Sequence, residues 1–194
     1  MFADCPQPTQ ALAYWKEYLL DYETKFWPAP DDWNVTRQEP NYPENFAYVY
    51  NRILFIGIDL VGGTVLNNRD WKNREDADLQ WIDDQYNLHQ GEFDVMVVLG
   101  HSDPAIQANA YFFQNFYNNV KNNYKLQVIF INQNLTGATW GLTPKYNGIN
   151  NLMHVVVEGS AWPPMLVQID TRAGTVQIDQ GQWYSQYMSN LTRS

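Results

Sequence analysis

The sequence contains a single cysteine, Cys5, among its 194 residues. A lone cysteine cannot form a disulfide within the chain, so a small fold held together by several disulfides is excluded. We expect Cys5 to be either a small buried apolar side chain or one half of a bridge to another chain or to a missing segment. With 45% apolar residues, the chain is expected to fold as a single domain, residues 1–194, around an apolar core.

Basic residues are also scarce. The chain has 12 Lys and Arg against 21 Asp and Glu, which gives a formal net charge of −9. No segment gathers the basic side chains that a protein needs to follow a phosphate backbone, so nucleic-acid binding is disfavoured. The same charge would repel an anionic substrate unless a bound cation reversed it locally.

No apolar run is long enough for a membrane span, and residues 1–6 do not have the features of a signal peptide. We therefore expect either a protein that stays in the cell or one whose upstream portion is missing from this segment. Asn-x-Thr sequons at Asn34, Asn134 and Asn190 would be glycosylation sites in surface loops if the protein were secreted.

Aromatic residues, in contrast, are abundant at 15% of the chain, so rings must fill much of the core or of a binding surface. Hydrophobic periodicity predicts an α/β fold in which helices alternate with buried strands, followed by a C-terminal antiparallel meander. The predicted helices are 9–26, 71–88 and 103–124; the strands are 46–50, 52–60, 93–100, 126–132, 152–158, 165–170 and 175–179; and 28–45 is a long surface loop.

One strand-to-helix junction has the features of a functional site. The buried strand over residues 93–100 ends at Gly100, His101 follows it, and Asp103 with Pro104 is expected to start the next helix. The carboxyl end of a central strand opens onto a crevice, where a histidine can bind a metal or transfer a proton. Alternatively, the Gly-His pair only forms a tight corner. The polar segment 132–140 is a candidate second wall of the crevice.

Four segments occur in an order that is typical of one family: Cys5-Pro6 with ALAYWKEY (11–18), PENFA (43–47), LFIGIDLVGG (54–63) and VVLGHSDP (97–104). In these segments and in its order of elements, the chain resembles the C-terminal half of calcineurin-like metallophosphoesterases of a secreted or periplasmic branch. The resemblance implies part of a β-sandwich flanked by helices. It also implies an extracytoplasmic location and a pair of divalent metals (Mn, Fe or Zn) that would activate water against a phosphate ester.

The sequence departs from the family pattern in its metal motifs. The D-x-H, G-D-x-x-D and G-N-H or G-D-N-E motifs of the N-terminal half are absent from it. His101 matches the single metal-binding histidine of the fourth motif. The fifth motif, G-x-H or G-D-G-H in the family, is replaced here by a degenerate region with Asn132, Asn134 and Thr136, whose oxygens are poor substitutes for an imidazole on a transition metal.

Two functions follow from this pattern. The first is a non-catalytic pseudophosphatase that serves as a binding or assembly module and has no cofactor. The alternative is a metal-dependent phosphoesterase, for phosphomonoesters or diesters, that is completed by a missing N-terminal half. In either case, half of a sandwich would leave an edge and an apolar face uncovered, so we expect a partner chain or a homo-oligomer.

Overall fold

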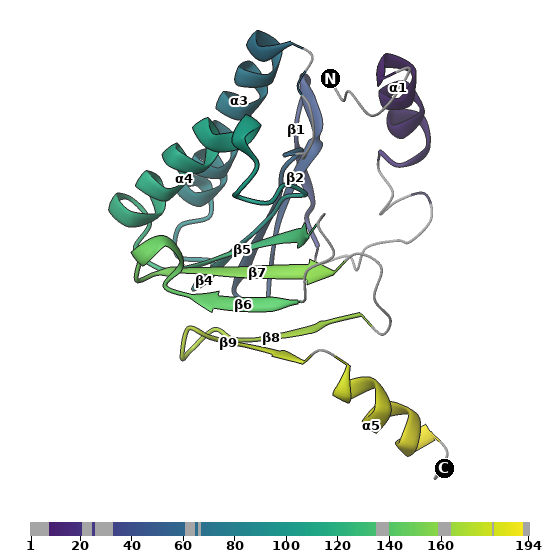
Figure 1. Ribbon diagram of the computed structural model, residues 1–194, viewed down its shortest axis with the longest axis vertical. Coiled ribbons are helices and arrows are strands. Elements are labelled where there is room, and N and C mark those ends of the chain that lie inside the picture. The colour runs from purple at the N-terminus through teal and green to yellow at the C-terminus, as the bar shows by residue number, and fades with distance from the viewer. Residues whose placement is uncertain are drawn as a thin grey trace.

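The computed structural model describes residues 8–20, 25, 33–60, 65, 67–134, 140–158, 164–179 and 181–191. Cys5 and Thr136 lie outside these residues, as do the side chains of Asn134 and Asn190. The elements (Figure 1) are α1 (Pro8–Tyr18), β1 (Thr36–Gln38), β2 (Tyr42–Tyr50), β3 (Ile53–Gly57), α3 (Asn68–Leu88), β4 (Val95–Leu99), a 3-10 turn η1 (Gln107–Asn109), α4 (Ala110–Asn122), β5 (Gln127–Asn134), β6 (Gly141–Pro144), a second turn η2 (Tyr146–Gly148), β7 (Leu152–Glu158), β8 (Leu166–Asp170), β9 (Thr175–Asp179) and α5 (Gln182–Leu191).

The predicted α/β class is confirmed, and its centre is a mixed seven-stranded sheet. The strand order is β1-β2-β3-β4-β5-β7-β6. The strands β3, β4, β5 and β7 run parallel, whereas β1 and β2 at one edge and β6 at the other are antiparallel to their neighbours. The carboxyl ends of the four parallel strands therefore lie along the same edge of the sheet.

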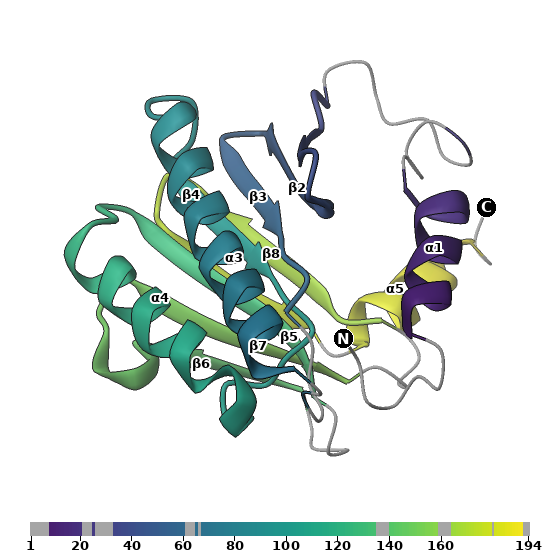
Figure 2. The ribbon, with the colours of Figure 1, turned by 90° about the horizontal axis from the view of Figure 1, so that it is seen from above.

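The helices α3 and α4 cover one face of this sheet, and Figure 2 shows them in front of its strands. Alternate residues of the strands point to this face, where they meet the apolar side of each helix. Asn67 caps α3, because its Oδ1 accepts hydrogen bonds from the N–H groups of Arg69 and Asp70. The fully buried members of the core here include Leu54, Ile56, Ile82, Met96, Val98, Phe112, Phe116 and Val120.

A two-stranded sheet of β8 and β9 packs against the opposite face of the large sheet. Val176 of this hairpin belongs to the same apolar cluster as Val95, Val97, Ile129 and Val155 of the large sheet. The predicted three-stranded meander is therefore wrong in one respect: only its last two strands form an antiparallel hairpin. The first, β7, is buried on both faces and pairs in parallel with β5, as apolar strands covered on both sides commonly do.

Two other predicted boundaries are corrected by the structure. The predicted loop 28–45 contains β1 and the start of β2. The edge strand β1 has only three residues, all polar, so a hydrophobic pattern does not reveal it. Asp103 caps only a turn, since its Oδ1 accepts a hydrogen bond from the N–H of Ala105. The backbone of Ile106 is extended, so α4 starts at Ala110 after a 3-10 turn.

Aromatic rings line the β1–β3 part of the face opposite α3. The ring of Tyr48 stacks on Trp33 at 5.0 Å on one side and on Phe55 at 5.0 Å on the other, and Phe46 lies 6.3 Å from it. This ladder accounts for part of the high aromatic content. No helix in the described part of the chain is both long and apolar enough to cross a membrane.

Candidate functional site

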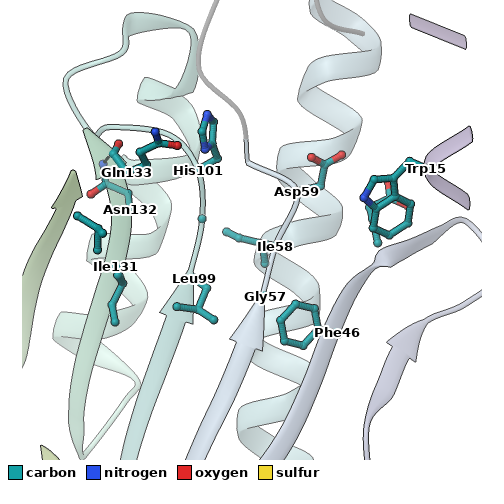
Figure 3. A pocket seen from close by; sticks show the side chains of 13 residues that line it. Trp15, Phe46, Gly57, Ile58, Asp59, Leu99, His101, Ile131, Asn132 and Gln133 are labelled. Atoms are coloured by element: carbon teal, nitrogen blue, oxygen red, sulfur yellow. Dashed lines mark hydrogen bonds between the residues drawn. The ribbon is translucent and has the colours of Figure 1, made fainter. Parts of the chain in front are cut away.

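A cavity of about 630 Å³ opens where the carboxyl ends of the parallel strands meet the start of β2 (Figure 3). We call it the edge pocket. The residues that line it come from five strands of the sheet (β2, β3, β4, β5 and β7), from the turns that follow β3 and β4, and from α1. The apolar side chains are those of Trp15, Phe46, Ile58, Leu99, Ile131 and Val157. The polar side chains are those of Glu44, Asp59, His101, Asn132 and Gln133.

His101 occupies the position that the sequence predicts, directly beyond the end of β4. Its side chain is exposed and lines the edge pocket. The turn that carries it is held by backbone hydrogen bonds from the His101 N–H to the Leu60 carbonyl (2.9 Å) and from the Gly100 N–H to the Ile131 carbonyl (3.1 Å). His101 thus lies in a tight corner and also lines the crevice.

The degenerate fifth-motif region meets the same pocket through Asn132 at the end of β5. Asn132 is buried, and its Oδ1 lies 2.5 Å from Nε2 of His154 on β7, while its Nδ2 donates to the Gln133 carbonyl at 2.9 Å. An amide oxygen can only accept, so the His154 Nε2 carries the hydrogen. Burial lowers the pKa of His154, which favours this neutral imidazole. Both ends of the Asn132 amide are therefore engaged inside the protein.

Asp59 and Glu44 bring negative charge to the pocket, and Arg74 of α3 joins them. Arg74 Nη1 lies 2.5 Å from Glu44 Oε1 and 2.8 Å from Asp59 Oδ2. All three side chains are largely buried, with exposed fractions of 17% for Arg74, 7% for Glu44 and 19% for Asp59. We call Glu44, Asp59, Arg74 and their neighbour Asp78 the ion cluster.

Asp78 is the fully buried member of the ion cluster. Its Oδ1 accepts a hydrogen bond of 2.7 Å from Asn45 Nδ2, and the Asn45 Oδ1 in turn accepts from the Asp59 N–H at 2.7 Å. Burial raises the pKa of Asp78 to about 8, although the Asn45 hydrogen bond and Arg74 oppose the shift. Asp78 is therefore mainly protonated at neutral pH. Burial also raises the pKa of Asp59, against the attraction of Arg74.

The described residues do not assemble a metal centre. Among them, no group of three His, Cys, Asp or Glu side chains is placed to hold a metal ion. His101 and Asp59 both line the pocket, but Asp59 is turned to Arg74. The metal-binding role of His101 thus stays a prediction, and the side chain of Asn134 and the whole of Thr136 lie outside the described residues.

The predicted glycosylation sites fall in different settings. Asn34 is exposed just before β1, and its sequon residue Thr36 donates a hydrogen bond of 3.2 Å to the Ala47 carbonyl. Asn134 is the last residue of β5 and Asn190 lies in α5. Only Asn34 therefore lies outside regular secondary structure, as a surface-loop acceptor would.

Sequence reasoning missed three of the polar and aromatic residues at the pocket. Asp59 lies inside the predicted strand 52–60, whereas β3 ends at Gly57 and leaves Asp59 in the turn beyond it. An acidic residue at the end of an apolar run is the signal that could have found it. Glu44 lies within the predicted loop 28–45, and Trp15 lies within the predicted helix 9–26. Nothing in the local sequence brings these two to the carboxyl edge of a sheet.

Comparisons of the chain with protein-family models, with curated proteins and with solved structures found no match.

Gly57, at the end of β3, has no side chain, which leaves space for the ring of Phe46 in the wall of the pocket. A Cβ on this residue would lie within 2.7 Å of three ring carbons of Phe46. We expect Gly57→Ala to displace that ring and lower the free energy of unfolding by about 1–3 kcal/mol. Urea denaturation measures the loss. Gly141→Ala is the matched control in a strand, because no atom lies within 4 Å of its Cβ; equal effects of the two substitutions would contradict the expectation.

Proposed function

We propose that the protein is a metallophosphoesterase-like binding module that does not catalyse phosphoester hydrolysis on its own. The observation that carries the proposal is the edge pocket. It lies at the carboxyl ends of parallel strands, where α/β proteins bind ligands, and it has His101 at its rim without a set of metal ligands among the described residues.

The replaced fifth motif supports the loss of catalysis. In the family that the sequence resembles, this position supplies an imidazole to the metals. Here the Asn132 Oδ1 is hydrogen-bonded to His154 and its Nδ2 donates to the Gln133 carbonyl, so this side chain is a poor replacement for an imidazole ligand. A cavity with mostly apolar walls and a few convergent polar groups remains, which is the usual make-up of a small-molecule site.

A metal-dependent phosphoesterase completed by another polypeptide segment is the second candidate. The exposed imidazole of His101 favours it, since that side chain is open to a ligand from outside the described residues. The described residues alone do not fit a two-metal centre, so Mn, Fe or Zn would need most of its ligands from elsewhere. The predicted partner chain or homo-oligomer, and the extracytoplasmic location, likewise remain proposals.

Metal content and hydrolysis distinguish the two candidates. For the binding module, we expect purified protein to contain no stoichiometric Mn, Fe or Zn by elemental analysis and to hydrolyse neither p-nitrophenyl phosphate nor bis(p-nitrophenyl) phosphate. His101→Ala should then leave the metal content and the melting temperature unchanged, because the side chain is exposed. Light scattering of the same preparation reports whether it is a monomer.

His89→Ala is the control, because His89 caps the far end of α3 beside Glu92. Stoichiometric metal that is lost in His101→Ala and kept in His89→Ala, together with measurable hydrolysis, would reject the binding module in favour of the enzyme.

A further inference from the structure

We infer that the edge pocket binds an organic cation, a primary ammonium group attached to an apolar body of aromatic size. The inference rests on the proposed function, because it names the ligand class of the same binding site. It follows from the charge left over in the ion cluster, from the unpaired Oε2 of Glu44 and from the aromatic rings that line the same pocket.

The ion cluster has more negative than positive charge next to the pocket. Glu44 and Asp59 share the single guanidinium of Arg74, and Asp78 adds no charge while it is protonated. One unit of negative charge is therefore left when both carboxylates are ionised. The described residues that line the pocket include no Lys or Arg to balance it. An incoming cation would meet a charge that is already largely desolvated, where attraction is strongest.

Glu44 also lacks one hydrogen-bond donor. Its Oε1 contacts Arg74, but its Oε2 is buried and has no hydrogen-bond partner. A buried acceptor without a donor is costly, and native proteins leave few of them. A rotation of the Glu44 carboxylate that turns this oxygen toward the pocket would let an ammonium N–H supply the missing donor, whereas a quaternary ammonium has no N–H and a phosphate would add negative charge.

Two aromatic rings line the same pocket as these carboxylates. Trp15 of α1 and Phe46 of β2 both line the edge pocket together with Glu44, and Figure 3 shows the Asp59 carboxylate between His101 and Trp15 along the edge of the sheet. A cation next to an indole face is attracted by the ring quadrupole. The cavity continues away from the charged end along Ile58, Leu99 and Ile131, which would contact the apolar body of the ligand.

Calorimetric titration with four probes of similar shape tests the inference: 2-phenylethylammonium, its N,N,N-trimethyl analogue, 2-phenylethanol and phenyl phosphate. We expect the primary ammonium to bind at least about tenfold more tightly than the neutral alcohol, the difference that a hydrogen bond between charged groups makes. The trimethyl analogue should bind more weakly than the primary ammonium, and phenyl phosphate should not bind.

Two variants locate the binding. Glu44→Gln keeps the shape of the side chain and leaves Arg74 paired with Asp59, and it should weaken binding of 2-phenylethylammonium about tenfold. Trp15→Leu should also weaken it, whereas Tyr18→Leu, which changes an exposed ring on the same helix, should not. Trp15→Leu decides the matter if Glu44→Gln fails to fold.

Tighter binding of phenyl phosphate than of the ammonium, or equal binding of the primary and trimethyl cations, would overturn the inference, as would ammonium binding that neither variant weakens. These failures differ from a failure of the proposed function. Protein that is free of metal and inactive but binds no ammonium rejects only the ligand class, whereas stoichiometric metal with hydrolysis rejects the binding module itself.

Discussion

Replacing Arg74 with methionine is expected to lower the free energy of unfolding by about 3–5 kcal/mol near neutral pH, because it removes one partner of a buried ion pair. Arg74 is the only cation that Glu44 and Asp59 contact among the described ion pairs, at 2.5 and 2.8 Å. Methionine keeps much of the apolar stem, so the loss reports on the charge. Without Arg74, two largely buried carboxylates would repel each other next to Asp78.

Lys72→Met is the matched control for this experiment. Lys72 lies on the same helix and pairs with Asp76 at 2.8 Å, but both side chains are about half exposed. Water screens such a pair, so its removal should cost far less than removal of Arg74. Chemical denaturation of the three proteins at pH 7 gives the comparison. Losses of similar size would show that the Glu44–Arg74–Asp59 contacts do not stabilise the fold as a buried pair does.

Replacing Asp78 with asparagine is expected to raise the free energy of unfolding above that of the unsubstituted protein, and to raise it more at pH 8 than at pH 4. In the folded protein the pKa of Asp78 is raised to about 8, chiefly by burial, from an ordinary value of 3.8. Between these two values the folded state holds a proton that the unfolded state has released, so stability falls as the pH rises. Asparagine does not titrate and therefore avoids this loss, which amounts to at most about 6 kcal/mol.

The measurement is urea denaturation of both proteins across this pH range. At pH 4 they should be similar, because the amide oxygen of asparagine still accepts the hydrogen bond from Asn45. Asp94→Asn is a control whose effect should not change across this pH range. The hydrogen bond from Arg52 lowers the pKa of Asp94 below its ordinary value of 3.8, so its contribution to stability is constant between pH 4 and pH 8 and is lost only at lower pH. An Asp78→Asn gain that does not grow with pH would contradict the raised pKa.

The two stretches that the sequence predicts best are the ones with the strongest local pattern. Residues 71–88 repeat apolar positions at helical spacing, and α3 is found over Asn68–Leu88. The run that ends at Gly100 forms β4, and His101 follows it at the carboxyl edge. In both cases the side chains of one segment are enough to specify the element, since its apolar face must be buried.

The sequence prediction was wrong for strands whose hydrophobic pattern is weak or fits two different structures. The strand Leu152–Glu158 is apolar along most of its length, which fits either a hairpin or a parallel interior strand, and only its pairing with β5 decides between them. β1 and β6 are short edge strands that were not predicted. They form because their backbones hydrogen-bond to β2 and β7.

The sequence by itself determined the α/β class, the main helix and the position of His101 at a strand end. Only the tertiary structure decided what surrounds that histidine. Trp15, Glu44 and Asp59 are up to 44 residues apart in the chain, yet they line one pocket, and Arg74 joins two of them from a helix. Local periodicity encodes which face of a segment is buried, whereas burial, pKa and unpaired oxygens depend on which distant segments fold against one another.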